Sequence, residues 1–181
     1  MNANQLQSVL KGELIELRPI RADDFEALFA VASDPLIWQQ HPAKDRHQED
    51  AFQEFFQEAL ASGGALVAID RKDGRVIGSS RFHGYDAEKS EIEIGWTFLA
   101  RSHWGGDYNG EMKRLMLEHA FQFVKSVVFL VVPQNVRSQR AVRRSAGFAW
   151  APAPMRAGAR AWFMRSGGRL RRSSSIPTYR P

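Results

Sequence analysis

Two strand-like segments with an amphipathic helix between them constrain the fold of this chain most strongly. Residues 90–100 ("SEIEIGWTFLA") alternate polar and apolar side chains, which is typical of a strand with one buried face. Residues 126–132 ("SVVFLVV") form an apolar run with the length of a buried central strand. Apolar residues recur at helical spacing from about 109 to 124. A strand, a helix and a second strand predict a right-handed crossover within an α+β (mixed α/β) fold.

The turn before this helix has the features of an anion site. Helix N-termini carry unpaired backbone N–H groups and a partial positive charge, and glycines let a ligand approach the backbone. Gly105, Gly106 and Gly110 occupy the turn, but neither the Rossmann nor the P-loop pattern is met. Asp107 places a carboxylate in the same turn, where an anionic ligand would bind.

The rest of the chain also divides into short elements. Two prolines interrupt residues 33–42 and predict a loop there. An apolar stripe that includes Phe52 predicts a helix over 47–61. The remaining predicted elements are a strand at 12–20, a helix that begins at Asp23 and Asp24, a hairpin of 65–70 and 75–85, and a helix at 135–146 that Asn135 caps.

Length and composition indicate one globular domain. The chain has 181 residues, 44% hydrophobic and 25% charged, and no cysteine. A disulfide frame, a thiolate metal site and a cysteine nucleophile are therefore excluded, and no metal site is predicted. No apolar run approaches the ~20 residues of a membrane span. We expect a cytoplasmic protein without a membrane partner, either a monomer or a homodimer.

The charge is distributed unevenly along the chain. Residues 1–118 have a net charge of −7, whereas residues 119–181 contain 12 basic residues and no acid. A basic tail is compatible with nucleic acid or an anionic surface. The tail has few aromatic residues to stack on bases, which argues against nucleic acid.

Four segments, in this order, resemble the GNAT acyl-CoA-dependent N-acetyltransferases. They are "LRPIRADDFEALFAVASDP", "EIEIGWTFLARSHWGG" with the turn "WGGDYNGE", "VVFLVV", and "PQNVRSQRAV". The branch typified by ribosomal-protein-alanine N-acetyltransferases is most similar, and the resemblance covers roughly residues 12–142. It implies a splayed mixed sheet flanked by helices, with acetyl-CoA as the co-substrate and an amine as the acceptor.

The resemblance also implies which residues bind acetyl-CoA. The pantetheine arm would pair with the strand end, and Asn135 would contact the cofactor or cap its own helix. The pyrophosphate would lie on the amides of the turn. The implied cofactor-binding residues are Thr97, Phe98, Leu99, Trp104, Gly105, Gly106, Asp107, Tyr108, Asn109, Gly110 and Asn135.

This turn departs from the family's pattern R/Q-x-x-G-x-G/A at Trp104, Asp107 and Asn109. A carboxylate that faces a pyrophosphate at ~4–6 Å costs on the order of 1 kcal/mol in water, and several times more near a protein surface. An Asp107 side chain that points to solvent would leave its amide available to the ligand. Aspartate also tolerates positive φ better than most residues.

The chemistry needs a base for the amine and a proton for the leaving thiolate. Glu91 and Glu93 alternate onto one face of their strand, and we favour Glu93 as the base because it is nearer the expected splay. Many relatives supply the proton from a tyrosine whose position here is Val142. Ser138 matches a serine of the similar branch and is the predicted acid. His83 is a further cleft candidate.

The family's pattern fails after Val142. Residues 143–181 contain no acid and no strand alternation. One codon choice for "RRSAGF", read two bases out of frame, encodes K-I-G-G-V, which suits the expected helix end better. We therefore divide the chain into a GNAT-like domain at 1–142 and a basic low-complexity tail at 143–181, which is either disordered or the product of a frameshift. We expect the closing C-terminal hairpin to be missing.

Three functions remain open at this point. The first is acetyl transfer from acetyl-CoA to a primary amine, either of a small molecule or of a protein or peptide N-terminus. The second is a GNAT-like binding module with impaired catalysis, and the third is a basic nucleic-acid-associated protein. Trp38, His41 and Phe52 could line an acceptor pocket, or they could be ordinary core residues.

Overall fold

The computed structural model describes residues 6–144, 148–156 and 159–169. Helices and strands alternate much as the sequence patterns predict. The strands are β1 (Leu10–Lys11), β2 (Ile15–Pro19), β3 (Ala65–Asp70), β4 (Val76–Asp86), β5 (Glu91–Leu99), β6 (Ser126–Val131), β7 (Phe148–Arg156) and β8 (Ala159–Arg169). The helices are η1 (Ala22–Asp24), α2 (Phe25–Ala32), α3 (Pro35–Trp38), α4 (Glu49–Ala61), η2 (Arg101–His103), α5 (Asp107–Ala120) and α6 (Val136–Arg144).

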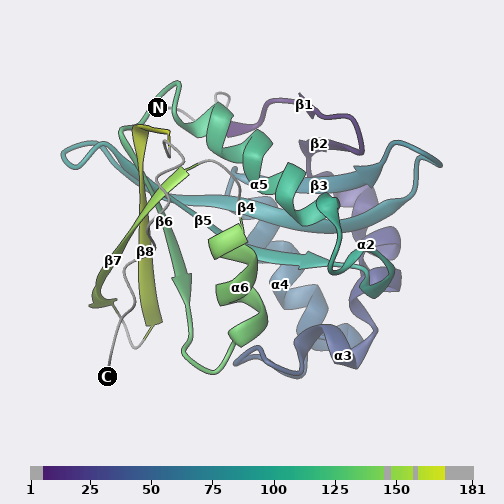
Figure 1. The fold of residues 1–181 in the computed structure, drawn as a ribbon. Helices are drawn as coiled ribbons and strands as arrows, with labels where there is room; N and C mark the ends of the chain where they lie inside the picture. Colours follow the sequence, from purple (N-terminus) through teal and green to yellow (C-terminus); the bar gives the residue numbers. More distant parts are fainter. Residues whose placement is uncertain (1–5, 145–147, 157–158, 170–181) are drawn as a thin grey trace.

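The described strands form a mixed sheet in the order β1-β2-β3-β4-β5-β6-β8-β7. Neighbouring strands run antiparallel except β5 and β6, which are parallel and joined through α5. The predicted crossover is therefore confirmed. Figure 1 shows α5 on one side of the sheet and α2 and α4 on the other. This arrangement confirms the predicted α+β class and the sheet flanked by helices.

Two apolar clusters fix these layers. The first packs α5 residues such as Met112 and Met116 against Ile92 and Ile94 of β5. The second packs the phenylalanines of α4, including Phe52, against Phe98 of β5. Strict alternation would put Ile92, Ile94 and Phe98 on one face, so it is the register shift between Gly95 and Phe98 that turns Phe98 into the opposite layer.

Strands β5 and β6 separate soon after they pair. Their parallel ladder covers only Glu91–Glu93 of β5, opposite Ser126–Val128 of β6. Residues 94–99 continue along β4 on the other side, with a register shift that sets Trp96 and Thr97 opposite Ser80. Trp96 has a φ of 50°, a conformation rare for a bulky residue. The edge of residues 94–99 that faces β6 is consequently left without a strand partner among the described residues.

Two local predictions differ from the structure. The segment predicted as a loop contains the short helix α3, because Pro35 stands at its first position, where a missing N–H costs nothing. The side chain of Asp34 caps this helix by accepting from the N–H of Leu36 at 3.0 Å. Helix α5 begins at Asp107 and not near Asn109, so the first helical turn includes part of the predicted loop.

The expectation that the closing hairpin is missing is wrong. Strands β7 and β8 pair with each other, and β8 pairs with β6 from Ser126 to Val131. A backbone ladder needs hydrogen-bonding groups rather than particular side chains, so a segment without alternation can still close the sheet. The frameshift and the domain boundary at residue 142 stay predictions. Residues 170–181 of the predicted tail lie outside the described residues.

Candidate active site

A cavity of about 1130 Å³ opens where β5 and β6 separate. It runs from α3 past the free edge of β5 to the start of α5 and along α6. Small-molecule pockets typically measure about 300–1,000 Å³, so this one suits a long ligand. The predicted site residues that line it are Thr97, Phe98, Leu99, Trp104, Gly105, Gly106, Asp107, Asn109, Gly110, Asn135 and Ser138.

The turn into α5 lines this cavity with the N-terminal end of the helix. Gly105 has a φ of 73°, which favours glycine, and Gly106 is the N-cap of the helix with a φ of −103°. Asp107 is the first residue of the helix, and its φ is not positive. Replacing the family's glycine with Asp107 therefore strains no backbone. Its exposed carboxylate instead lies at the positive end of the helix dipole, where a ligand phosphate would otherwise be the anion.

Trp104 connects the turn to the neighbouring elements. Its indole Nε1 donates to the carbonyl of Leu99 at 2.9 Å, so this strand carbonyl already has a protein partner. The guanidinium of Arg137 stacks on the indole, with the Cζ atom 3.9 Å from the ring centroid. Arg137 also donates to carbonyls of α3, and its backbone N–H donates to Gln40 at 3.0 Å.

Basic side chains outnumber acidic ones around the cavity. The basic residues of the lining are Arg46, Lys113, Arg114, Arg137, Arg140 and Arg144, against the acids Glu13, Asp107 and Glu111. The carboxylate of Glu111 is already occupied, because it accepts the backbone N–H groups of Glu13, Leu14 and Ile15 at 2.8–2.9 Å. The cavity therefore favours an anionic ligand despite Asp107.

Asn109 contributes a side-chain oxygen, Oδ1, without a hydrogen-bond donor in the described part of the chain. Its Oδ1 is buried and accepts no hydrogen bond from the described residues. An unpaired buried acceptor costs about 1–3 kcal/mol, which a ligand N–H could recover. The unpaired atom, the free strand edge and the basic lining together suit an extended anionic ligand that also carries amide groups.

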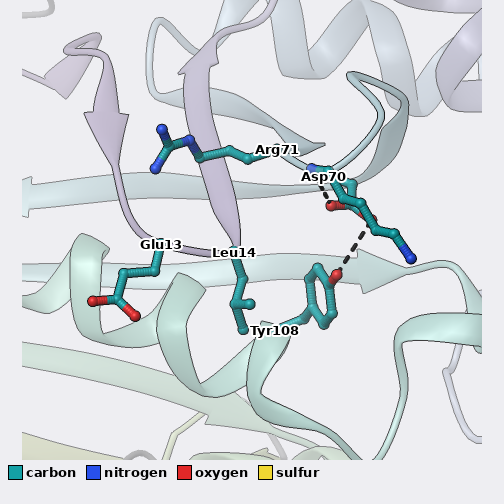
Figure 2. Close-up of a pocket in the computed structure, with 6 residues that line it drawn as sticks. Glu13, Leu14, Asp70, Arg71 and Tyr108 are labelled. Carbon is teal, nitrogen blue, oxygen red and sulfur yellow. Dashed lines mark hydrogen bonds between the residues drawn. The ribbon is translucent and has the colours of Figure 1, made fainter.

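Tyr108 does not line this cavity. Figure 2 shows its side chain pointing from α5 toward Asp70, where the hydroxyl donates to Oδ2 at 3.3 Å. Its ring also meets the ring of His103 edge-on at 4.6 Å between centroids. Tyr108 lines a separate hollow of about 310 Å³ with Glu13 and Asp70. Its side chain thus anchors the turn to the end of β3, and only its backbone remains near the predicted phosphate site.

Glu93 lies beside the cavity rather than in its lining. Alternation places it on the face of β5 opposite Ile92 and Ile94, which pack with α5. A Cβ atom built on Gly95, a lining residue, would lie 3.1 Å from Glu93 Oε1, so the carboxylate leans toward the cavity. Burial raises the pKa of Glu93 from 4.5 to about 7. A carboxylate with this pKa is suited to accept a proton near neutral pH.

The other two strand candidates are placed differently. Glu91 is buried at the start of β5, within the stretch that pairs with β6. His83 is exposed on β4, with its ring 4.9 Å from the ring of Trp96. Glu93 is thus the closer of the two glutamates along β5 to Gly95, which lines the cavity, and its role as the base stays a prediction.

Helix α6 supplies the remaining predicted residues. Asn135 caps the helix, since its Oδ1 accepts the N–H of Ser138 at 3.0 Å. Asn135 and Ser138 both line the cavity, as does Val142, which is 3% exposed. Val142, where the GNAT resemblance would place a tyrosine, thus lines the cavity with an aliphatic side chain that has no acidic proton to donate.

The sequence patterns missed Lys113, the most buried basic group of the cavity. It is 4% exposed, and its Nζ donates to Thr97 Oγ1 at 2.7 Å. Burial lowers its pKa from 10.5 to about 7. A lysine next to Met112 on an amphipathic helix gives no signal of burial, because it occupies the edge of the apolar stripe.

The far end of the cavity is lined by α3 and the loop after it. Trp38 and His41 contribute to this lining, whereas Phe52 is fully buried in the core and does not. Burial, helped by the positive charge of Arg46, lowers the pKa of His41 to about 4, so its imidazole is neutral at neutral pH. The guanidinium of Arg46 stacks on Phe55 at 4.4 Å from the ring centroid.

Two kinds of feature are absent from the described residues. No group of three or more histidine, cysteine, aspartate or glutamate side chains in them could hold a metal ion. None of the helices in the described ranges is long and apolar enough to cross a membrane.

Comparisons with known proteins agree with this geometry. Among curated proteins none matches the chain. A GNAT-family structure from Chromobacterium violaceum ATCC 12472 has a TM-score of 0.76 at 21% identity, over 90% of this chain and 88% of that one. For a GCN5-related N-acetyltransferase from Brucella melitensis the TM-score is 0.68 at 22% identity, over 87% of this chain and 78% of that one.

A third structure was determined with a ligand. Mycobacterium smegmatis RimJ in complex with CoA-disulfide has a TM-score of 0.64 at 19% identity, over 87% of both chains. Identities this low establish the fold alone. The family model "Acetyltransferase (GNAT) domain" matches residues 15–149, which is most of the chain. The chain therefore belongs to the GNAT acetyltransferase family.

Proposed function

We propose that this protein transfers the acetyl group of acetyl-CoA to a primary amine, either of a small molecule or of a protein or peptide N-terminus. The observation that carries the proposal is the long basic cavity that begins at the N-terminus of α5 and follows the free edge of β5. The phosphates of acetyl-CoA would bind at the N-terminus of α5, and its pantetheine amides would bind along the free edge of β5.

The donor site would use backbone groups for most of its contacts. The N–H groups at the start of α5, together with Arg137 and Arg140 of α6, are suited to the phosphates. The unpaired edge of residues 94–99 is suited to the pantetheine amides. The carbonyl of Leu99 is excluded from this role while Trp104 donates to it.

Glu93 is the proposed base. With a pKa of about 7, its carboxylate accepts a proton from the acceptor ammonium and leaves a neutral amine. The amine nitrogen then attacks the thioester carbonyl carbon. Glu93 lies on the face of β5 opposite α5, so the acceptor would approach from the side of α3 and α4 while the donor extends from α5.

The acceptor end suits an amine that carries a neutral or anionic group. Arg46 lines this end, and the imidazole of His41 adds no positive charge at neutral pH. A small amine and a peptide N-terminus both meet these requirements. A cytoplasmic location and a monomeric or homodimeric state stay predictions.

Ligand binding and turnover test the proposal in sequence. Thermal-shift and calorimetric titrations with acetyl-CoA should show saturable stabilisation, and thiol release should then appear with at least one member of a panel of small amines and N-terminal peptides. No stabilisation at high ligand excess would sink the proposal. Binding without thiol release across the panel would instead favour a binding module, which the carboxylate of Asp107 makes the second candidate.

The basic C-terminal segment motivates one further comparison. A nucleic-acid-associated protein would bind DNA or RNA with an affinity that falls steeply as salt rises. We expect weak binding of this kind that acetyl-CoA does not displace. Tight, salt-dependent binding in a chain that ignores acetyl-CoA would favour the nucleic-acid role.

A further inference from the structure

The amine of Lys113 is buried, which is unfavourable for a charged group. Its side chain extends from the second turn of α5 to the bulge of β5, where Nζ donates to Thr97 Oγ1 at 2.7 Å. Nζ also lies 5.1 Å from the ring centroid of Phe129 on β6. The residue is 4% exposed and lines the large cavity. The amine thus lies at the floor of the gap between β5 and β6.

No carboxylate compensates this amine. Among the described residues, no ion pair involves Lys113, and the hydroxyl of Thr97 and the ring of Phe129 are neutral partners. Burial is the cause of the lowered pKa, and no charged side chain of the described residues contributes to it. An ammonium without a counter-ion destabilises a folded protein by several kcal/mol unless it releases its proton.

A purely structural role does not explain the amine. Thr97 Oγ1 already lies 2.7 Å from Ser80 Oγ, so the bulge keeps a hydrogen-bonded hydroxyl without Lys113. A methionine or leucine would fill the same space at no electrostatic cost. Buried groups with shifted pKa values next to a cavity concentrate at functional sites.

The reaction needs a proton donor near the point where β5 and β6 part. Val142 of α6 cannot protonate a thiolate, and Ser138, the acid predicted from the sequence, lines the cavity from α6, beyond the end of β6. Lys113 reaches the point where β5 and β6 part, which is where a donor that extends along β5 from the α5 N-terminus would end. The amine therefore lies in the part of the cavity where the sulfur of such a donor is expected.

We propose that Lys113 is the acid that protonates the leaving thiolate of CoA, an inference that rests on the proposed acetyl transfer. The acceptor nitrogen forms a bond to the carbonyl carbon, and the carbon–sulfur bond breaks with its electron pair on sulfur. The Lys113 ammonium gives its proton to that sulfur and becomes a neutral amine. The Lys113 amine regains a proton from solvent, and solvent takes up the proton that the acylated nitrogen releases.

The test compares Lys113→Met with Lys125→Met in the full chain. Methionine keeps the apolar stem of Lys113 and removes the amine. Lys125 is exposed between α5 and β6 and serves as the matched control. Thiol release should fall by roughly 10²–10⁴-fold in kcat for Lys113→Met, with the acetyl-CoA dissociation constant changed less than about threefold. Lys125→Met should match the wild type.

A second measurement needs no acceptor. The thiol of bound CoA, titrated through its thiolate absorbance, should ionise at a pH at least about one unit lower in the wild type than in Lys113→Met, because the ammonium stabilises the thiolate. Equal thiol titrations, or unchanged kcat in Lys113→Met, would overturn the inference. Acetylation of Lys113 detected by peptide mass spectrometry would overturn it too, since an acetylated amine cannot donate this proton.

The two proposals fail in different ways. If CoA does not bind the wild type, the acetyltransferase function fails and the role of Lys113 fails with it. If the wild type binds CoA and releases thiol but Lys113→Met does so equally well, only the role of Lys113 is lost.

Discussion

The carboxylate of Glu111 accepts the backbone N–H of Leu14 at 2.8 Å, although 97 residues separate them in the chain. The same carboxylate accepts the N–H groups of Glu13 and Ile15, both at 2.9 Å. Burial works to raise the pKa of Glu111, but these three hydrogen bonds outweigh it and hold the pKa below its ordinary value. One side chain of α5 thus holds the turn between β1 and β2.

Glu111→Ala should destabilise the protein by about 3 kcal/mol, because it leaves three backbone donors without their charged acceptor. Denaturant unfolding measures the change. Glu118→Ala is the control, since Glu118 is exposed on the same helix and forms an ion pair with Arg114. The contribution of the Glu111 carboxylate to folding stability is present above pH 4.5 and is lost as the pH falls through the lowered pKa of this group. Equal losses in both variants would refute the role of this clamp.

Removing the charge of Asp107 should tighten acetyl-CoA binding. If the phosphates bind at the start of α5 as proposed, the carboxylate would oppose them at a cost of about 1 kcal/mol, so Asp107→Asn and Asp107→Gly should lower the dissociation constant about five- to tenfold. The gain should shrink at high salt. Asp50→Asn, which removes an acid from the first turn of α4, is the control for calorimetry. An unchanged or weaker affinity at position 107 would show that the carboxylate is harmless or useful.

Glu93→Gln should reduce kcat/KM by roughly 10²–10⁴-fold. In the wild type, ionisation of Glu93 near pH 7 should set the rising limb of the kcat/KM profile, and loss of the proton from Lys113, whose pKa is also about 7, should set the falling limb. The free energy of unfolding should change in the opposite direction. Because the pKa of Glu93 is higher in the folded protein than in the unfolded chain, the wild type should lose stability relative to Glu93→Gln as the pH rises from 4.5 to 7. Glu88→Gln, exposed in the turn before β5, is the control. If kcat/KM depends on pH in the same way in Glu93→Gln and in Glu88→Gln, Glu93 is not the base.

Lys113→Met should raise the melting temperature at neutral pH, opposite to the usual effect of a core substitution. The folded pKa of Lys113 is about 7 against 10.5 unfolded, so the unfolded chain binds the extra proton between these values. The stability of the wild type therefore rises with pH across this window, and its deficit relative to Lys113→Met should shrink. Parallel thermal melts from pH 7 to pH 10.5 test this, and a constant difference would contradict it.

Hydrophobic periodicity predicted most of the fold. The apolar stripe around Phe52 identified α4, and the alternation over 90–100 identified β5. Local rules were less reliable at element ends. Pro35 was interpreted as a breaker although it begins α3, and Gly110 did not delay the start of α5. Periodicity says which face is buried, whereas helix ends depend on caps only a few residues long.

The candidate site was predicted less completely. A local motif predicts residues such as Gly106, which would bind a ligand through their backbone N–H groups, and the structure places these residues in the lining of the cavity. Tyr108 belongs to the same motif, yet Asp70 from β3 draws its side chain away. Lys113 becomes buried only because α5 crosses the bulge of β5, an arrangement that no local pattern contains.

The contacts of Arg137 have a consequence for the order in which substrates bind. This one side chain stacks on Trp104 at the donor end and donates to Ile37 at the acceptor end. A ligand that displaced the indole would also disturb the contacts of the arginine with α3. Thermodynamic reciprocity then requires each substrate to change the affinity of the other by the same factor. The binding affinities of the two substrates should therefore be coupled, and Arg137 is the side chain that joins their sites.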